Sequence, residues 1–160
     1  METRKALRLD GYDYSAQGAY FVTFCVRDMQ PLLWHAPVGA RIARPTDALP
    51  LSPAGHIVQA AIEQIPLHYP CVFVDNSVVM PNHVHILLRI QHENGRAMRA
   101  PTISQIINQL KGYSTKQIGH AIWQRSYYDH IIRDEADYTA RYNYILDNPR
   151  RWAEDEYYIP

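Results

Sequence analysis

The chain has 160 residues, of which 47% are hydrophobic and 20% charged, a composition typical of one globular domain that needs no disulfide staples. Its 16 Lys and Arg balance its 16 Asp and Glu, which argues against a protein that binds any nucleic acid through a large excess of positive charge. No run approaches the ~20 apolar residues of a membrane span, and the charged N-terminus lacks the apolar stretch of a signal peptide, so we expect a cytoplasmic protein.

The first predicted strand covers residues 19–26, which are rich in aromatic and β-branched side chains. Prolines and glycine interrupt residues 36–53 so often that a loop is expected there. A helix is predicted over residues 54–64, because apolar residues recur there at helical spacing, Ser52 precedes it and Pro66 stops it.

Two further strands are predicted over residues 72–80 and 83–90, and Pro81-Asn82 between them indicates a hairpin. A second helix opens near Thr102, where isoleucines at helical spacing mark a buried stripe, and Gly112 weakens its continuation. These elements alternate in a way that favours one sheet with helices packed on it.

A fourth strand over residues 127–133 and a helix over 134–148, with Asp134 as its N-cap, complete the chain. The order β-α-β-β-α-β-α predicts a single α+β domain over residues 1–160, a ferredoxin-like split βαβ with an antiparallel sheet. Two helices cover one face of this sheet, and we expect the other face to be open for chemistry. We interpret Cys25 and Cys71, each within an apolar run, as inert core residues.

The strand over residues 83–90 carries a pair of histidines. Because side chains alternate along a strand, His83 and His85 share one face, while Val84, Ile86 and Leu88 mark the helix-covered face. The two imidazoles are about 6.5 Å apart along the backbone at ~3.3 Å per residue, within reach of one divalent ion. Two such histidines are also common as plain polar surface, so the spacing alone leaves both interpretations open.

The last helix adds polar groups that could complete such a site. Arg141, Tyr144 and Asn148 have helical spacing and lie on one face. An Asn amide oxygen with two imidazoles forms a neutral N/O site suited to Mg²⁺ or Mn²⁺, while a phenol can attack phosphorus. The chain has 12 tyrosines, however, and most tyrosines in a domain serve as packing residues.

Several blocks of the chain resemble the REP-associated tyrosine transposases, which belong to the single-tyrosine HUH transposase group. The blocks occur in the family's order and cover nearly the whole chain. They are Tyr14-Ser15, Tyr20-Phe21-Val22-Thr23, Val79-Met80-Pro81-Asn82-His83-Val84-His85, Trp123-Gln124-Arg125-Ser126-Tyr127-Tyr128-Asp129-His130-Ile131-Ile132-Arg133 and Tyr144-Ile145-Leu146-Asp147-Asn148-Pro149.

This resemblance implies a ferredoxin-like fold with a C-terminal catalytic helix and a divalent metal on His83 and His85. It implies that Tyr144 forms a covalent 5′-phosphotyrosine with single-stranded DNA, and that Asn148 is the third metal ligand. The expected partner is single-stranded or hairpin-forming repeat DNA, which would associate the protein with the nucleoid. Whether the protein acts as a monomer or a homodimer, with Tyr144 working in cis or in trans, stays open.

Residues 89–151 hold ten Lys and Arg against six Asp and Glu, a local excess of positive charge that the tail Glu154-Asp155-Glu156 and the first half of the chain offset. Packing or ordinary solvation explains each such side chain equally well. The residues expected to contact phosphate are Lys111, Arg125, Arg133, Arg141 and Arg150, and those expected to stack on bases are Tyr127 and Tyr128.

Two other functions fit the same pattern. A ferredoxin-like sheet with aromatic side chains also describes modules that bind single-stranded or hairpin nucleic acid without chemistry. A metal phosphohydrolase would use His83 and His85 to hold the ion and a water molecule, rather than a tyrosine, as nucleophile. Neither alternative predicts a covalent adduct with DNA.

Overall fold

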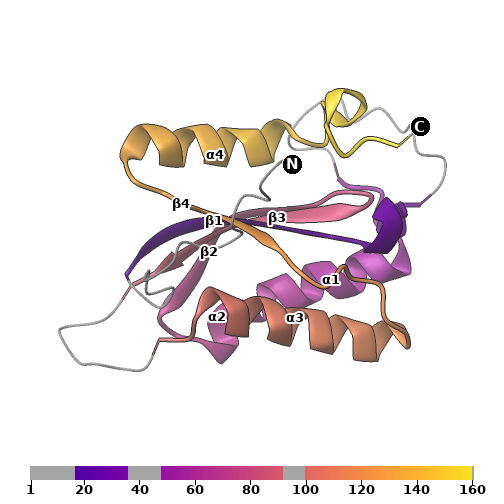
Figure 1. Ribbon diagram of the computed structural model, residues 1–160, viewed down its shortest axis with the longest axis horizontal. Helices are drawn as coiled ribbons and strands as arrows, with labels where there is room; N and C mark the ends of the chain where they lie inside the picture. The colour runs from indigo at the N-terminus through magenta and orange to yellow at the C-terminus, as the bar shows by residue number, and fades with distance from the viewer. Residues whose placement is uncertain (1–16, 36–47, 92–99, 160) are drawn as a thin grey trace, which may run out of the picture.

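The computed structural model describes residues 17–35, 48–91 and 100–159 (Figure 1). Four antiparallel strands form one sheet in the order β2-β3-β1-β4. This order and the alternation of strands with helices confirm the predicted α+β, ferredoxin-like arrangement. The strands are β1 (Gly18–Cys25), β2 (Val72–Val79), β3 (His83–Ile90) and β4 (Tyr128–Ile131).

The helices lie on both sides of the sheet (Figure 1). The first three cover one face, and α4 lies across the other, where it packs on β2 and β3. The expectation of an open second face is therefore wrong, because the C-terminal helix folds back over it. The helices are α1 (Pro53–Glu63), α2 (Ile65–His68), α3 (Ile103–Ile118) and α4 (Glu135–Asp147), with short 3-10 turns η1 (Arg27–Met29) and η2 (Trp152–Glu154).

Strand β3 runs through the middle of the sheet, between β2 and β1. Its residues Val84, Ile86 and Leu88 are fully buried. They alternate with His83 and His85, as the sequence predicts, because neighbouring side chains in a strand point to opposite faces. The strand is thus buried on both faces, and it carries the two histidines at the centre of the sheet.

Several element boundaries differ from the sequence prediction. Helix α3 continues through Gly112 to Ile118 and ends at Gly119, which has a left-handed φ of 99°. The cost of one glycine in a helix, about 1 kcal/mol relative to alanine, is small beside the burial of the apolar side of α3. A short helix, α2, follows α1 directly, because Pro66 is tolerated in its first turn. Strand β4 is shorter than residues 127–133.

The Pro-rich segment 36–53 lies partly outside the described residues, which resume at residue 48. Its end is ordered by a β-bridge between Trp34 and Leu51 and by Ser52, whose hydroxyl accepts from the Gly55 amide at 3.1 Å. Cys25 and Cys71 are free thiols and are half-buried rather than fully buried.

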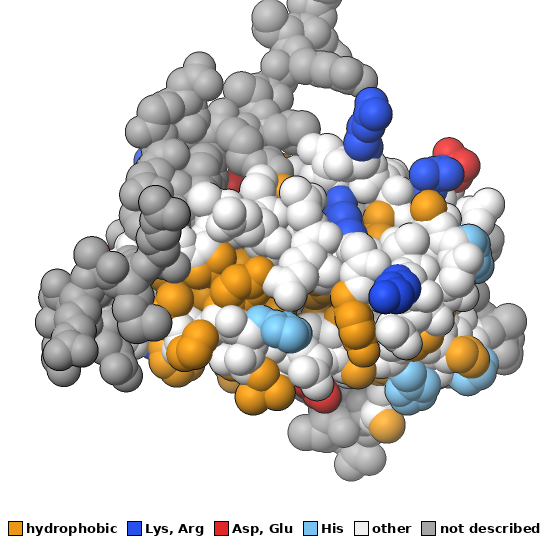
Figure 2. All heavy atoms as spheres, turned by 90° about the horizontal axis from the view of Figure 1, so that it is seen from below, with side chains coloured by type: hydrophobic (Ala, Val, Ile, Leu, Met, Phe, Trp, Pro, Cys, Tyr) orange, Lys and Arg blue, Asp and Glu red, His pale blue; other side chains and the backbone are white. Residues whose placement is uncertain are grey.

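Figure 2 looks onto the outer face of the helix layer, where hydrophobic side chains gather. A hollow between α1, α2 and α3 is lined there by Ile65, Ile106, Leu110 and Tyr113, among others. Within the described ranges, no helix has both the length and the apolar character needed to cross a membrane.

Substitution of Gly55 tests the close approach between α1 and the chain before it. A Cβ at this position would overlap the carbonyl oxygen of Leu33, which is backbone and cannot turn away. We expect Gly55→Ala to lower the free energy of unfolding by about 1–3 kcal/mol in urea titrations. Gly112→Ala is the control, because a Cβ there meets nothing within 4 Å and should raise stability by about 0.4–1 kcal/mol. A wild-type stability of Gly55→Ala would contradict the packing described.

Candidate active site

The two histidines of β3 face one another inside the protein. Their Nε2 atoms are 3.1 Å apart, and the side chains are buried under α4 and the C-terminal segment. The other nitrogen of each ring is already engaged: His83 Nδ1 bonds to Asn82 Oδ1 at 2.8 Å, and His85 Nδ1 to Thr23 Oγ1 at 2.7 Å. These bonds orient both rings so that the Nε2 atoms point to a common centre.

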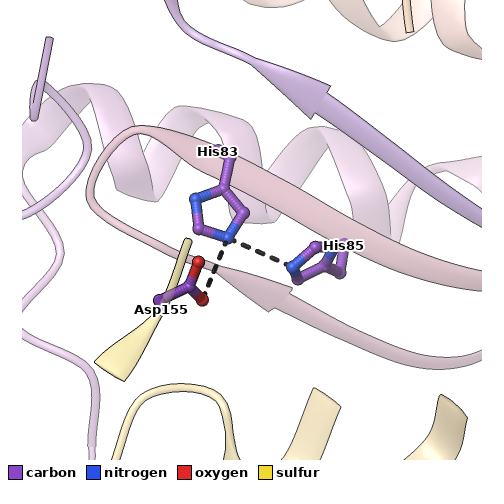
Figure 3. A group of neighbouring side chains, drawn as sticks. All are labelled: His83, His85 and Asp155. Carbon is purple, nitrogen blue, oxygen red and sulfur yellow. Dashed lines mark hydrogen bonds and ion pairs between the residues drawn. The ribbon is translucent and has the colours of Figure 1, made fainter. Parts of the chain in front are cut away.

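A carboxylate from the C-terminal segment reaches the same centre (Figure 3). Asp155 Oδ2 lies 3.8 Å from His83 Nε2, and its side chain is 1% exposed. The backbone amide of Tyr157 donates to Asp155 Oδ1 at 2.8 Å, which fixes the carboxylate. One ligand atom from each of His83, His85 and Asp155 lies within 4.8 Å of the others, so the three form a cluster able to hold a metal ion.

Asn148, at the end of α4, also contacts this cluster. Its Nδ2 donates to Asp155 Oδ2 at 2.9 Å. Its Oδ1 is buried and has no hydrogen-bond partner among the described residues. A buried amide oxygen without a partner costs free energy unless a donor or a cation approaches it. The donor set of two imidazoles, one amide oxygen and one carboxylate therefore fits a divalent cation.

Burial sets the charge of the two histidines. It lowers the pKa of His83 from 6.5 to about 4, although Asp155 and the side chain of Asn148 oppose the change. It also lowers the pKa of His85 well below 6.5, and the neighbouring His83 and Arg141 lower it further. Both imidazoles are thus neutral at pH 7, which is the form that binds metals.

Tyr144 projects from α4 toward this pair. The centroid of its ring lies 5.3 Å from that of His85, and 40% of the residue is exposed. Burial raises the pKa of Tyr144, and Asp155 and Glu156 raise it further, whereas Asn148 and Arg141 lower it. Tyr144 and His85 line one cavity of about 370 Å³, so a substrate group could contact both.

A second phenol also lies beside the histidines. The ring centroid of Tyr157 is 4.4 Å from that of His83 and 6.3 Å from that of His85. No role for Tyr157 or Asp155 was predicted from the sequence. No local pattern in the sequence marks these two residues, because side chains outside their segment hold them in place. The Asn82 side chain donates to the carbonyl of Tyr157, and the Asn148 side chain donates to Asp155.

Two of the residues predicted to contact DNA lie away from this site and have other partners. Lys111 is 9% exposed, and its ammonium donates to the carbonyls of Gln124 and Ser126, both at 2.9 Å. Tyr127 is buried, and its hydroxyl bonds to Ser104 Oγ at 2.9 Å. Both side chains tie α3 to the segment before β4, which is a structural role.

The other predicted contacts are at the surface. Arg141 and Tyr128 line the cavity of Tyr144, and Tyr128 is 47% exposed. Arg125 and Arg133 are exposed. Arg150 is exposed as well and pairs with Asp147 at 3.2 Å.

No family model matches this sequence. An uncharacterized protein of Haemophilus influenzae is 32% identical over 176 aligned positions, which cover 98% of this chain and 93% of that protein. A second Haemophilus influenzae protein, described as a candidate REP-associated tyrosine transposase, is 26% identical over 100 residues. That match covers 57% of this chain and 56% of the relative, so it spans little more than half of each.

Two solved structures share the fold. One is a REP-associated tyrosine transposase bound to a REP hairpin, with a TM-score of 0.60 and 21% identity over 89% of this chain and 73% of that chain. The other is a candidate transposase from Deinococcus radiodurans R1, with a TM-score of 0.50 and 16% identity over 92% of this chain and 97% of that chain.

The lowered pKa of His83 predicts how stability depends on pH. Because the folded pKa of about 4 lies below the unfolded value of 6.5, the unfolded chain binds more protons between these values. Stability is therefore fully present above pH 6.5 and falls as the pH drops toward 4. Urea titrations without divalent ions should show a shallower fall for His83→Gln. The exposed His56→Gln is the control and should match wild type. An unchanged slope in His83→Gln would contradict the burial argument.

Proposed function

We propose that this chain, which belongs to the family of REP-associated tyrosine transposases, cleaves and rejoins single-stranded DNA through a 5′-phosphotyrosine on Tyr144. The observation that carries the proposal is the position of Tyr144, whose ring lies 5.3 Å from that of His85 in a shared cavity. A nucleophile next to a buried pair of neutral imidazoles is an arrangement suited to metal-assisted attack on phosphorus.

His83, His85 and Asn148 would hold a divalent ion, Mg²⁺ or Mn²⁺, and Asp155 is a further ligand that the structure supports. The Nε2 atoms of the two histidines and the carboxylate of Asp155 lie within 4.8 Å of one another, so they would be able to hold one ion together. Such an ion, when bound, neutralises charge on the scissile phosphate. The oxygen ligands favour a hard cation over structural Zn²⁺.

Tyr144 is a better nucleophile than Tyr157. Burial raises the pKa of both phenols, with Cys25 and Glu156 adding to the rise at Tyr157. Only at Tyr144 do a neighbouring amide, Asn148, and a cation, Arg141, lower the pKa. Tyr144 is also 40% exposed, so DNA can reach it without displacing the C-terminal segment from His83.

In the reaction, the phenol oxygen of Tyr144 attacks phosphorus and the bond from phosphorus to the 3′-oxygen breaks. The phenol loses a proton and the leaving 3′-oxygen gains one. The phosphotyrosine keeps the energy of the phosphodiester, and attack by a 3′-hydroxyl rejoins the strand without ATP. Helix α4 packs on β2 and β3, and it brings Tyr144 to the cavity that His85 also lines.

The partner would be hairpin DNA with a single-stranded flank, by analogy with the relative solved with a REP hairpin. Tyr128 could stack on a flanking base, because it is exposed at the cavity of Tyr144. Arg125, Arg133 and Arg150 are exposed cations that could contact the backbone. These contacts would set the position of the strand and not the chemistry.

The nucleophile can be tested by trapping. With a labelled hairpin oligonucleotide and Mn²⁺, wild type should form a protein–DNA adduct that survives denaturation, and Tyr144→Phe should form none, because it has no phenol oxygen to attack phosphorus. Tyr157→Phe and Tyr142→Phe are matched controls that should keep the adduct. Adduct in Tyr144→Phe but not in Tyr157→Phe would move the nucleophile to the C-terminal segment. Cleaved product with no adduct in any variant would instead indicate a phosphohydrolase.

The metal site can be tested apart from DNA binding. His83→Ala should abolish nicking and lower Mn²⁺ affinity by at least about tenfold, since removal of a ligand costs more than that of its hydrogen-bond partner. Hairpin affinity should stay within about threefold, because phosphate contacts elsewhere carry binding. Asp155→Asn should weaken Mn²⁺ binding in calorimetry if the carboxylate is a ligand. Equal loss of nicking and hairpin binding in His83→Ala would point to a structural role for the histidine.

A further inference from the structure

Arg141 lies in the same cavity as the proposed nucleophile. It precedes Tyr144 by one turn of α4, and both side chains line the 370 Å³ cavity together with His85. The guanidinium carbon lies 5.1 Å from the centroid of the Phe21 ring. The side chain is 34% exposed, so solvent screens its charge only in part.

Arg141, Tyr144 and His85 all lie against the ring of Phe21. It stacks on His85 with 5.1 Å between centroids and meets Tyr144 edge-on at 6.0 Å. The cation, the nucleophile and a proposed metal ligand therefore surround one aromatic side chain of β1. A phosphate that touches the phenol of Tyr144 would lie within reach of the guanidinium of Arg141.

Arg141 is held in place but keeps its terminal donors. Its Nε lies 3.5 Å from Asp137 Oδ1, one turn earlier on α4. Asp137 is itself fixed, because its Oδ2 bonds to His130 Nε2 at 2.7 Å and accepts from the Arg133 amide at 3.4 Å. Among the described residues, no hydrogen bond engages the Nη groups of Arg141. Two parallel N–H donors suit the two oxygens of a phosphate.

The charges of the site leave a role for such a cation. The histidines and Asn148 are neutral ligands, and Asp155 adds one negative charge beside the cavity. Attack on a phosphodiester adds negative charge to the phosphoryl oxygens in the transition state. Glu156 also lines the cavity, but it is an exposed carboxylate that water solvates. Arg141 is the cation that lines this cavity in the described part of the chain.

We infer that Arg141 is a further catalytic residue, whose guanidinium binds the non-bridging oxygens of the scissile phosphate, and that Asp137 positions it. The inference rests on the proposed function and adds to it a residue that binds the negative charge of the scissile phosphate. It separates Arg141 from the other cations expected to contact DNA, because Arg141 would act on the reacting phosphate rather than on affinity along the backbone.

The test compares a normal phosphodiester with a neutral methylphosphonate at the cleavage position of the hairpin oligonucleotide. On the phosphodiester, Arg141→Ala should slow adduct formation by roughly 100-fold or more, the usual loss for one transition-state donor. On at least one methylphosphonate diastereomer, which lacks the charged oxygen, the loss should shrink to less than about tenfold. The loss of rate in Arg141→Lys should lie between these limits, because lysine keeps the positive charge but lacks the two parallel N–H donors.

Two controls separate chemistry from folding and affinity. Lys116→Ala removes an exposed cation from α3, in the helix layer on the opposite face of the sheet, and should behave as wild type. Hairpin affinity of Arg141→Ala should stay within about threefold of wild type, since one phosphate contact among several is lost. Asp137→Asn should slow adduct formation less than Arg141→Ala does. Its loss of rate should also shrink on the same methylphosphonate diastereomer.

The outcomes are distinct. A wild-type rate for Arg141→Ala on the phosphodiester, or an equal loss on both substrates, overturns the inference and leaves Tyr144 as nucleophile. Absence of adduct in wild type itself overturns the proposed function and the inference together. Loss of hairpin binding in Arg141→Ala, in parallel with loss of rate, would reduce Arg141 to an ordinary backbone contact and also overturn the inference.

Discussion

The rest of the site depends on the contact between two neutral imidazoles buried at the centre of the sheet. Their Nε2 atoms are hydrogen-bonded to each other at 3.1 Å, while the Nδ1 atoms bond to Asn82 and Thr23. A neutral imidazole carries one N–H, so His83 Nδ1 donates to Asn82 Oδ1, whereas the Thr23 hydroxyl can donate to His85 Nδ1 and leave the N–H of His85 to donate to His83. Burial disfavours the charged form of both rings, so this network orients two neutral imidazoles in a cluster with Asp155 that is able to hold a metal ion.

Helix α4 and the C-terminal segment create that burial together, and α4 does so with little apolar packing of its own. Ile145 is its one fully buried residue within the described part of the chain. Polar contacts hold the helix instead: the Tyr138 hydroxyl donates to Asp75 at 2.7 Å, and the Asn76 side chain donates to the carbonyl of Tyr142 at 3.2 Å. Asp75 lies at an irregularity in the pairing of β2 with β3. A bulge re-aims side chains at a strand edge, which here brings two polar groups under the helix.

The difference between a buried strand and a helix held by polar contacts explains which features the sequence could predict. Alternation along β3 correctly placed His83 and His85 on one face, because a buried strand leaves little freedom in register. Helical spacing correctly put Tyr144 and Asn148 on one surface. Only the family resemblance brought this helix to the histidines, since the contacts of α4 with the sheet are aromatic and polar and give no hydrophobic stripe to read.

The positions of Asp155 and Tyr157 could not be predicted from the sequence for a related reason. Their segment makes a single 3-10 turn, η2, and its place is fixed by side-chain bonds from Asn82 and Asn148 and by packing of Trp152 on Trp34, with 6.4 Å between ring centroids. Such long-range polar contacts leave no periodic trace in the sequence. They also make the acidic segment and α4 interdependent, since Asn148 joins them through Asp155. Because Asp155 also lies 3.8 Å from His83 Nε2, the hydrogen bond from Asn148 links the end of α4 to the histidine pair through the C-terminal segment.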